Sequence, residues 1–515
     1  MNARVGFVPG QTKRQYRGLP LLLLAGLFAL LIGAVTAFGN LLASAMMVAV
    51  LGALALTGFP RLLFWFSVVG SLVLSGLFEL YLPGLQTLRW AFAGCTALFF
   101  VSVVLHDAWS PQQERQPLNS LTIACTLYLA ICAISLAANW HGAANAILGL
   151  KNYFQALGLL LGLALMARWD GLERNLTRTM LAIGLLQLPF VLHQFLVLAP
   201  KRMGMGPMIV PIDIVAGTFG ANFMGGGNNS VLAMFLVIVA AMMLSLWRNG
   251  ALQGRWLWLL APLLSPIFLN ESKVALVYLV LAFIVIFRTE ILRRPVRFLG
   301  LSVVLAMLAT GLLFSYVAVQ RANEYKTPAE MVEHFVRQNT QEGERYGTLA
   351  LNRTTSLTHW FKAQRRYTLS QTLFGHGPGA AKDDSTSVLT TGRNLANTAY
   401  PGMGIGLTTV SSMLWDIGVI GLAVALAMFA SALLLAGRLA RRHAASAYKS
   451  GLFQGLQASV AIFALSLIHK SFFTFQLGYQ VMLFLIFGYL IYASKHMAVD
   501  EIADAPPPPP RTELN

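Results

Sequence analysis

Long apolar runs, separated by short polar segments, fill most of this chain. An α-helix needs roughly 18 or more mostly apolar residues to cross a bilayer. By this criterion the sequence predicts about fourteen membrane-spanning helices, give or take two. The expected spans are 19–39, 41–59, 62–82, 88–106, 119–139, 152–168, 179–199, 229–247, 256–271, 273–292, 298–318, 409–436, 452–469 and 475–494. We therefore expect an all-α polytopic membrane protein.

The polar stretches between these runs define the expected organisation of the chain. One polar segment, 319–408, is much longer than the others, and a second, glycine-rich one covers 200–228. The end of the chain is acidic and then proline-rich, which predicts a disordered tail. In order, we expect a short N-terminal segment, helices 1 to 11 interrupted by the glycine-rich loop, the large loop, helices 12 to 14 and the tail: 1–18, 19–318, 319–408, 409–494 and 495–515.

Composition excludes a soluble globular protein. Hydrophobic residues make up 57% of the 515 positions and charged residues only 11%, against about a quarter charged in an ordinary soluble domain. The three cysteines, Cys95, Cys125 and Cys132, all fall in apolar spans and predict no disulfide framework. No His, Cys, Asp or Glu residues have metal-ligand spacing, so we expect neither a metal nor a cofactor.

The net charge of +17 is typical of nucleic-acid-binding proteins, but its distribution indicates membrane orientation instead. Basic residues concentrate in alternate short loops: Arg4, Lys13, Arg14, Arg17, Arg61, Arg115, Arg168, Arg174, Arg178, Arg248, Arg255, Arg288, Arg293, Arg294, Arg297, Arg438, Arg441, Arg442, Lys449 and Lys495. The opposite short loops hold only Arg89, Lys151, Lys201, Arg202, Lys273 and Lys470. Both termini are therefore expected in the cytoplasm, and the first span is expected to be a retained anchor rather than a cleaved signal peptide.

This orientation places the large loop outside the membrane, together with its most unusual stretch, "QTLFGHGPGA" at 371–380. Glycine-rich runs often wrap phosphates, because glycine adopts backbone angles that other residues avoid. The run lacks the Lys-Ser ending of a nucleotide-binding loop and would meet no ATP outside the cell. A phosphate that it binds must come from the membrane or from outside.

Basic residues crowd around this run. The large loop holds ten Lys or Arg against seven acidic residues, and most of the basic ones fall between 345 and 393. Because arginine binds phosphate in a bidentate manner, we expect anion binding here. A capping box at Thr327 predicts one short helix in the loop, and a second is expected from Thr354 or Ser356 to Arg366. The alternative is that these residues are solvated charges on a surface loop.

The order of several short motifs resembles the bacterial O-antigen polymerase and O-antigen ligase superfamily. The motifs are "GTFGANF", "LNESKVAL", "NRTTSLTHWFKAQ", "TLFGHGPG" and "LWDIGVIGL", which cover roughly 200–425. The resemblance implies a membrane glycosyltransferase fold of the GT-C type. It also implies transfer of a glycan from an undecaprenyl diphosphate carrier on the periplasmic face of the bacterial inner membrane. In that family, arginines of the two main external loops bind the diphosphate.

The resemblance itself assigns Arg353, Lys273, Arg366 and Gly377 to the diphosphate, and the other candidates come from the basic residues, glycines and possible bases of the external loops. The diphosphate-binding set is Arg202, Lys273, Arg353, Arg366, Arg393, Gly375 and Gly377, and the catalytic set is His376, Arg353 and Glu344. Candidates for the base that takes the acceptor proton are His376, His359, Glu344 and Asp383. By contrast, His141, His193 and His469 sit at or within spans, where they are expected to be packing residues.

Two motifs depart from the family pattern. The family usually has an arginine just before its "GTF" element, where this chain reads "IDIVAGTF". Ligases carry a histidine-asparagine pair before the span that follows the large loop, where this chain has "NLANTAYPGMG". The second departure favours a polymerase over a ligase.

The expected function is polymerisation of undecaprenyl-diphosphate-linked repeat units of an exopolysaccharide, capsule or O-antigen. The expected partners are the lipid-linked oligosaccharide, the bilayer, and a chain-length regulator and flippase of the same pathway, with no nucleic acid. The alternatives are ligase-type transfer of glycan to lipid A core or protein, a transporter or flippase, and a non-catalytic assembly subunit. Ion-coupled transporters usually carry ionisable groups within the membrane, and the candidates here are Glu79 and Asp416.

Overall fold

The structure is a computed structural model. Apart from isolated positions, it describes residues 56–82, 88–106, 119–140, 142–205, 209–224, 226–270, 272–296, 343–345, 348–382 and 394–503. The predicted N-terminal segment, the predicted spans at 19–39 and 298–318, most of the predicted span at 41–59, and Thr327 of the predicted capping box lie outside the described residues.

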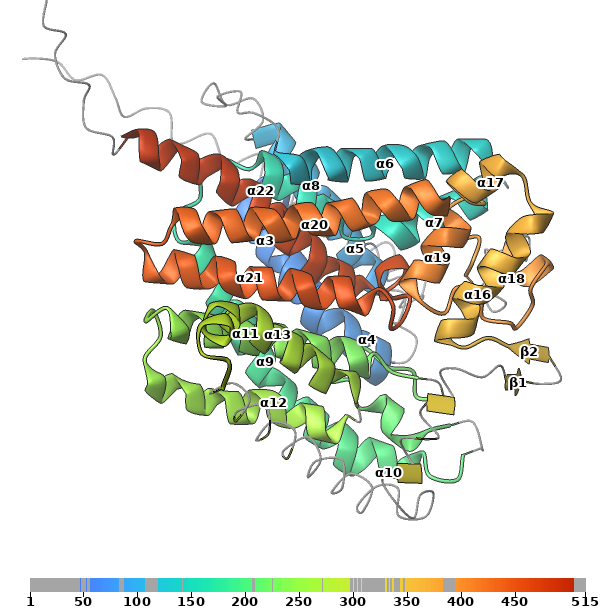
Figure 1. Cartoon of the computed structure of the whole chain (residues 1–515), viewed down its shortest axis with the longest axis horizontal. Helices are drawn as coiled ribbons and strands as arrows, with labels where there is room; N and C mark the ends of the chain where they lie inside the picture. The colour runs from blue at the N-terminus through green and yellow to red at the C-terminus, as the bar shows by residue number, and fades with distance from the viewer. Residues whose placement is uncertain are drawn as a thin grey trace, which may run out of the picture.

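The described chain is almost entirely helical (Figure 1). Before the large loop its helices, with η marking π- and 3-10 helices, are α3 (Pro60–Val69), η1 (Gly70–Leu74), α4 (Ser75–Tyr81), α5 (Arg89–His106), α6 (Ser120–Ala138), α7 (Ala143–Phe154), α8 (Leu157–Leu165), α9 (Leu172–His193), η3 (Gln194–Leu198), α10 (Ala199–Lys201), η4 (Pro211–Ile214), α11 (Asn229–Arg248), η5 (Gly254–Leu259), α12 (Leu260–Leu269) and α13 (Val274–Arg293). From the large loop onward the elements are β1 (Gly343–Arg345), β2 (Thr348–Ala350), α16 (Arg353–Ala363), η6 (Gln364–Arg366), α17 (Leu369–Phe374), α18 (Leu395–Thr398), α19 (Thr409–Asp416), α20 (Gly418–Arg442), α21 (Ala447–Ser466), η7 (Phe472–Thr474) and α22 (Leu477–Ala503).

The number of spans is smaller than predicted. In the part of the chain that the structure describes, eight helices are long and apolar enough to cross a membrane, or nine if the bent pair α7–α8 forms one span. The segment predicted at 256–271 is a shorter helix that contains Pro266. The one predicted at 452–469 belongs to α21, which carries polar residues such as Gln454 and Gln457. The protein is therefore a multi-pass membrane protein, and a hydrophobic run alone overcounted its spans.

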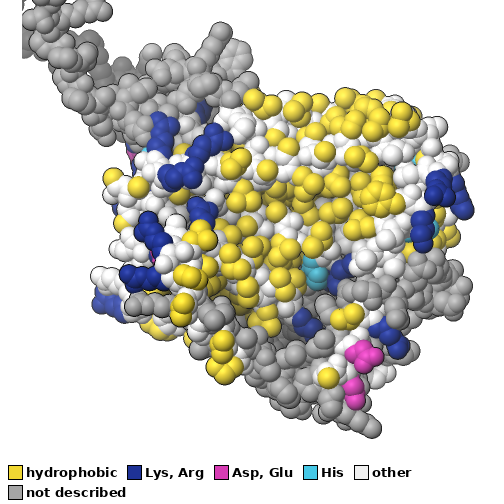
Figure 2. Space-filling view, viewed as in Figure 1, with side chains coloured by type: hydrophobic (Ala, Val, Ile, Leu, Met, Phe, Trp, Pro, Cys, Tyr) yellow, Lys and Arg dark blue, Asp and Glu magenta, His cyan; other side chains and the backbone are white. Residues whose placement is uncertain are grey.

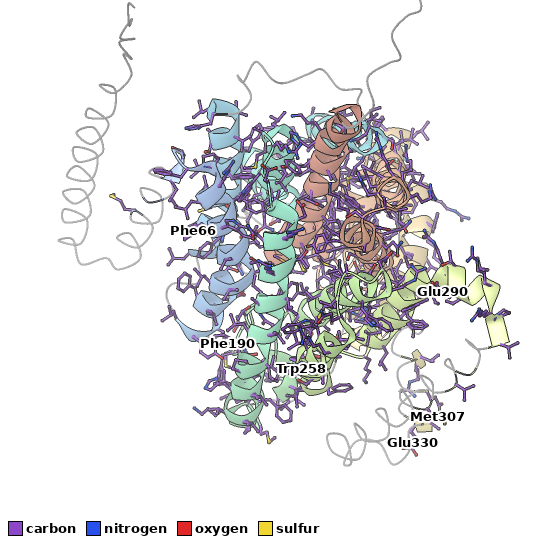
Figure 3. The ribbon with its side chains drawn as sticks, turned by 90° about the vertical axis from the view of Figure 1, so that its left-hand side faces the viewer. Phe66, Phe190, Trp258, Glu290, Met307 and Glu330 are labelled. Carbon is purple, nitrogen blue, oxygen red and sulfur yellow. The ribbon has the colours of Figure 1, made fainter. Side chains whose placement is uncertain are left out.

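Two helices form the centre of the bundle. Nearly every residue of α11 is buried, and so is the membrane-length part of α22. Helix α11 packs against α21, α13 and α12, while α22 packs against α8. A helix that is apolar on all sides belongs in the core of a large helical protein or in a membrane. The outer helices instead present apolar side chains outward, as Phe66 does on the outer side of α3 (Figure 3).

The helix ends fall into the two groups that the charge pattern predicts. At one end, Arg438 bonds to Ser120, Tyr448 to the backbone of Glu173, and Arg248 to Glu290. At the other end, the loop after α21 contacts α16 and α19, and the glycine run contacts the end of α6. Figure 2 shows an apolar belt between two regions where Lys and Arg gather. Which end faces outward stays a prediction.

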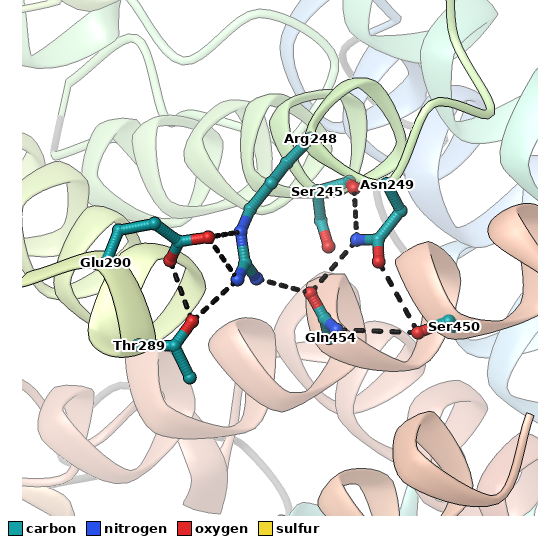
Figure 4. Close-up of polar contacts among 7 residues, drawn as sticks. All are labelled: Ser245, Arg248, Asn249, Thr289, Glu290, Ser450 and Gln454. Carbon is teal, nitrogen blue, oxygen red and sulfur yellow. Dashed lines mark hydrogen bonds and ion pairs between the residues drawn. The ribbon is translucent and has the colours of Figure 1, made fainter. Parts of the chain in front are cut away.

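A network of hydrogen bonds and one ion pair connects the helices at the more basic end, and we call it the Arg248 network (Figure 4). The guanidinium of Arg248 donates to Glu290 Oε1 at 2.6 and 2.8 Å, and to Thr289 Oγ1 at 2.8 Å. A further N–H donates to Gln454 Oε1 at 2.7 Å. Because these partners lie on α13 and α21, the network ties three helices together at one end of the bundle.

At the other end, a loop enters the bundle between α10 and α11. Residues 214–221 are all buried, although only the first of them lies in a regular helix. Gln194 accepts from the backbone N–H groups of Ala216 and Gly217 at 3.0 and 2.7 Å, and Gln187 accepts from Thr218 N at 2.9 Å. Buried backbone needs such partners. The "GTF" motif is therefore a rigid internal loop that fixes its neighbours, including Asp213.

The large loop departs in three details from the predicted structure. A short hairpin of β1 and β2 makes the chain not strictly all-α. The second predicted helix is α16, which begins at Arg353 because Asn352, rather than Thr354 or Ser356, forms the capping box. A separate helix, α17, covers the first four residues of the glycine run and ends at Phe374, with Gly375 as its C-cap. In addition, α22 continues to Ala503, past the start of the predicted tail, because no helix-breaking proline occurs before Pro506.

Candidate functional site

Arg353 is fixed at the first position of α16, where three segments of the chain meet. Its Nε donates to the backbone carbonyl of His469 at 2.7 Å. Thr409, at the start of α19, donates to the carbonyl of Lys470 from its backbone N–H at 3.3 Å and from its hydroxyl at 2.8 Å. The loop between α21 and η7 thus holds the beginnings of α16 and α19. Arg353 is half-buried, and burial lowers its pKa, an effect that nearby Tyr278 partly offsets.

Charged groups from two other loops surround Arg353. Burial lowers the pKa of the Lys470 ammonium, Asp213 counteracts this effect, and Arg353 adds to it. Arg202 is buried, and Asp213 partly offsets the lowering of its pKa by burial. These mutual effects require proximity, because the interaction between charges decays with distance. Asp213 is therefore close to both Lys470 and Arg202. Arg353 is close to Lys470, so this group holds three cations and one carboxylate, and its excess of positive charge suits an anion.

Two neutral polar groups complete this group of residues. Tyr278, on α13, is fully buried, and its hydroxyl has no hydrogen-bond partner within the described structure. His469 Nε2 is buried and likewise lacks a partner there. Burial lowers the pKa of His469 to about 3, and Arg353 and Lys470 add to this effect, so the ring is neutral at physiological pH. We call Arg202, Asp213, Tyr278, Arg353, His469 and Lys470 the Arg353 cluster.

The glycine run contacts a carboxylate of the protein itself. Asp416 is buried, and its Oδ1 accepts from Ala381 N at 2.7 Å while its Oδ2 accepts from the Tyr153 hydroxyl at 2.7 Å. Burial raises the pKa of Asp416 to about 6, against hydrogen bonds from Ala381, Tyr153, Gly379 and Ala380. The backbone at the end of the run is therefore curled around an anion that belongs to α19.

Residues 375–377 of the run pack closely against the end of α19. The N–H groups of His376 and Gly377 donate to the carbonyls of Trp415 and Asp416 at 2.8 and 2.9 Å. Gly375 has φ +75, and a Cβ there would lie 2.4 Å from the carbonyl carbon of Asp416. The residue must be glycine for conformation and for space. The two N–H groups are thus already used within the protein, and contact of Gly375 and Gly377 with a diphosphate stays a prediction.

His376 lies in an aromatic group rather than beside the cations. The residue is 5% exposed, and its ring packs edge-on against Tyr367 with centroids 4.6 Å apart. Its centroid is 5.9 Å from that of Trp415. His359 belongs to the same group through Tyr400, at 5.3 Å. This arrangement fits a packing role for both histidines, and their role as a base remains a prediction.

A small pocket lies between the glycine run and α7. Its lining includes Asn139, Asn145, Asn152, His376 and Pro378, and it encloses about 30 Å³. This space holds one or two water molecules. The phosphate-binding role expected for the run stays a prediction.

The remaining predicted site residues are spread over the large loop and α13. Arg366 is exposed at the end of η6, and Lys273 is exposed at the N-cap of α13. Glu344 lies in β1, where the structure describes only the backbone. Arg393 and Asp383 lie outside the described residues. Of the predicted set, Arg353 and Arg202 both belong to the Arg353 cluster, where Asp213 and Lys470 link them.

Sequence reasoning missed Lys470, Tyr278, Asp213 and His469. Lys470 is one of only six basic residues in the less basic set of loops, and this scarcity was an available signal. Tyr278 is hidden within an apolar span, and nothing in its local pattern marks it. His469 was interpreted as a packing residue because it follows a hydrophobic run.

No three His, Cys, Asp or Glu side chains in the described part of the chain lie close enough to hold a metal ion. The sequence matches no protein-family model and no curated protein. Function must therefore be inferred from the chemistry of the Arg353 cluster.

Proposed function

We propose that this chain is a membrane glycosyltransferase that polymerises undecaprenyl-diphosphate-linked repeat units of a surface polysaccharide. The observation that carries the proposal is the Arg353 cluster, which holds three cations from separate segments and one carboxylate: Asp213 is close to Lys470 and Arg202, and Lys470 is close to Arg353. The resemblance of five motifs between 200 and 425 to the O-antigen polymerase and ligase superfamily supports the same function. Two of the cations, Arg202 and Arg353, come from the loops that the resemblance implicates.

The chemistry needs an activated donor, and a sugar on a lipid diphosphate provides one. As the glycosidic bond to the diphosphate breaks, negative charge grows on the leaving oxygen. Cations held in place before the reaction stabilise that charge without reorganising. Arg353 meets this requirement because its Nε bond to the His469 carbonyl and the Asn352 capping box fix the start of its helix. A base takes the proton of the acceptor hydroxyl.

A polymerase is favoured over a ligase because "NLANTAYPGMG" lacks the histidine-asparagine pair of ligases. The growing chain and the incoming unit would both be lipid-linked. A flippase and a chain-length regulator of the same pathway are the expected partners.

The contacts of the two acidic residues considered for ion coupling, Glu79 and Asp416, argue against a transporter. Glu79 pairs with Arg89 at 3.2 Å, and Asp416 accepts from Ala381 and Tyr153. Both carboxylates have internal partners, whereas a coupling-ion site needs groups that exchange partners during transport.

Deletion of the gene, followed by gel analysis of the surface glycan, separates the candidate functions. Loss of a polymerase leaves single repeat units on the surface acceptor. Loss of a ligase leaves long chains on the carrier lipid, and loss of a flippase leaves unpolymerised units on the cytoplasmic face. Complementation with Arg353→Ala and with Lys362→Ala, which changes an exposed cation of the same helix, tests whether the Arg353 cluster is responsible.

A further inference from the structure

Two buried polar atoms of the Arg353 cluster lack a hydrogen-bond partner in the described structure: the Tyr278 hydroxyl and His469 Nε2. Burying a polar group without a partner costs about 1 to 3 kcal/mol, so such atoms are rare in native proteins. Here two of them come from different elements, α13 and the loop after α21. Their location beside Arg353 indicates that a ligand satisfies them.

We propose that Tyr278 and His469 are positioning residues for the phosphate group, each donating a hydrogen bond to an oxygen held by Arg353 and Lys470, and that His469 takes up a proton from solvent as the phosphate binds. This inference rests on the proposed function for the identity of the ligand as a diphosphate.

The four residues have complementary roles. Arg353 and Lys470 supply charge, while the phenol and the imidazole supply neutral donors with fixed directions. Tyr278 is rigid because it is fully buried in α13. His469 is restrained by its own backbone, since its carbonyl accepts from Arg353 Nε at 2.7 Å. A phosphate that contacts Arg353 therefore lies beside both neutral groups.

The proton uptake follows from the charges around His469. Without a ligand, the ring is surrounded by Arg353 and Lys470, and burial together with these cations keeps it neutral. The other nearby ionisable groups are Tyr278, close to Arg353, and Asp213, which lies close to Lys470 and Arg202. A diphosphate brings negative charge that outweighs the two cations, so the protonated imidazole becomes favourable. One proton then moves from solvent to the imidazole ring for each diphosphate molecule bound.

The test is calorimetric titration of the full-length protein in nanodiscs with inorganic pyrophosphate, in two buffers of different ionisation enthalpy. The wild type should bind and take up protons. Tyr278→Phe keeps the ring and removes the hydroxyl, and His469→Gln keeps a donor but cannot be protonated. Tyr278→Phe should weaken binding about tenfold, as expected for loss of a hydrogen bond to a charged group. His469→Gln should weaken it by a similar factor, because a neutral amide replaces the charged donor. His469→Gln should also abolish the proton uptake, while the exposed control Lys362→Ala should change neither property.

Unchanged affinity in both variants, or unchanged proton uptake in His469→Gln, would overturn the inference, as would a wild type that does not bind pyrophosphate. Thermal unfolding of each variant identifies misfolded protein, and the affinity and proton uptake of His469→Gln still test the inference if Tyr278→Phe fails to fold. The proposed function fails separately: wild type that binds pyrophosphate with proton uptake but transfers no glycan keeps the site and removes the glycosyltransferase.

Discussion

Two arginines at opposite ends of the bundle have opposite surroundings. Arg248 shares its N–H groups among Glu290, Thr289 and Gln454, so its charge is met by a carboxylate at 2.6 Å and two neutral acceptors. Arg353 is close to a second cation, Lys470, and beside two neutral groups whose polar atoms lack partners in the described structure. The first arrangement is complete without a ligand and ties helices together. The second carries an excess of positive charge and is suited to bind an anion.

The role proposed for Arg353 requires its end of the bundle to face the periplasm. A reporter enzyme that is active only in the periplasm tests this orientation with an all-or-none result. A periplasm-active enzyme fused at about Asp384 should be active, and the same enzyme fused at about Arg441 should be inactive, because basic loops are retained in the cytoplasm. Enzyme activity per amount of fusion protein is the measurement. The reverse pattern would place the Arg353 cluster in the cytoplasm and remove the lipid-linked donor.

Exchanging the two arginines for alanine should separate activity from stability. Arg353→Ala should reduce polymer formation at least about 100-fold at normal protein level, a typical loss when one donor to developing charge is removed. Arg353→Lys should rescue poorly, because an ammonium lacks the planar fork of donors. Polymer on gels and the protein level in the membrane are measured together. Normal polymer from Arg353→Ala would exclude it from the site.

Arg248→Ala provides the matched control for that experiment. It should lower the free energy of unfolding by about 1 to 2 kcal/mol, because the lost hydrogen bonds are charged but partly exposed. Less protein should reach the membrane, while polymer per folded molecule stays within about twofold of wild type. A selective loss of activity at normal protein level would mean that the two arginines do not differ as described.

The glycine run offers a graded test of its packing role. Gly375→Ala should be most damaging, since the new Cβ would lie 2.4 Å from the backbone of Asp416 at a φ of +75. In Gly377→Ala the new Cβ would lie 3.3 Å from the Asn139 carbonyl oxygen, so the loss of unfolding free energy should be smaller. It should be smallest in Gly404→Ala, because nothing lies within 4 Å of the new Cβ. We expect a loss of about 3 kcal/mol or more for the first and about 1 kcal/mol for the last. Thermal unfolding is the measurement, and equal losses at all three positions would contradict the packing account.

The pH dependence of stability should reflect Asp416. Its pKa is raised from 3.8 to about 6, so the folded protein holds this proton more tightly than the unfolded chain. Stability therefore falls as pH rises through this window, by about 3 kcal/mol in total, and the contribution is constant above it. Asp416→Asn removes the titration and can still accept from Ala381 N while donating to the Tyr153 oxygen. Thermal unfolding between pH 4 and 7 should show a flatter profile for the variant, and parallel profiles would exclude Asp416.

The sequence predicted the class of the protein better than it predicted the residues of the candidate site. Apolar runs and alternating charge identified a multi-pass membrane protein and grouped the loops that meet, because both signals are local. The motif order singled out Arg353, and Arg202 was a candidate as a basic residue near the position where the family arginine is missing. Tyr278 and Asp416 could not be found in this way, since their importance depends on contacts between residues distant in the sequence: Tyr278 lies near Arg353, and Asp416 bonds to Tyr153. The glycine pattern predicts a phosphate-binding loop, but it cannot show that the backbone at the end of the run bonds to the carboxylate of Asp416, which is distant in the sequence.

The central claim is that the Arg353 cluster transfers glycan from a lipid diphosphate. Purified protein in proteoliposomes, supplied with undecaprenyl-diphosphate-linked repeat units, should produce longer lipid-linked glycans and release free undecaprenyl diphosphate. Arg353→Ala should lose both products, while Arg248→Ala should retain them per folded molecule. No elongation by the wild type, or equal elongation by Arg353→Ala, would contradict the account.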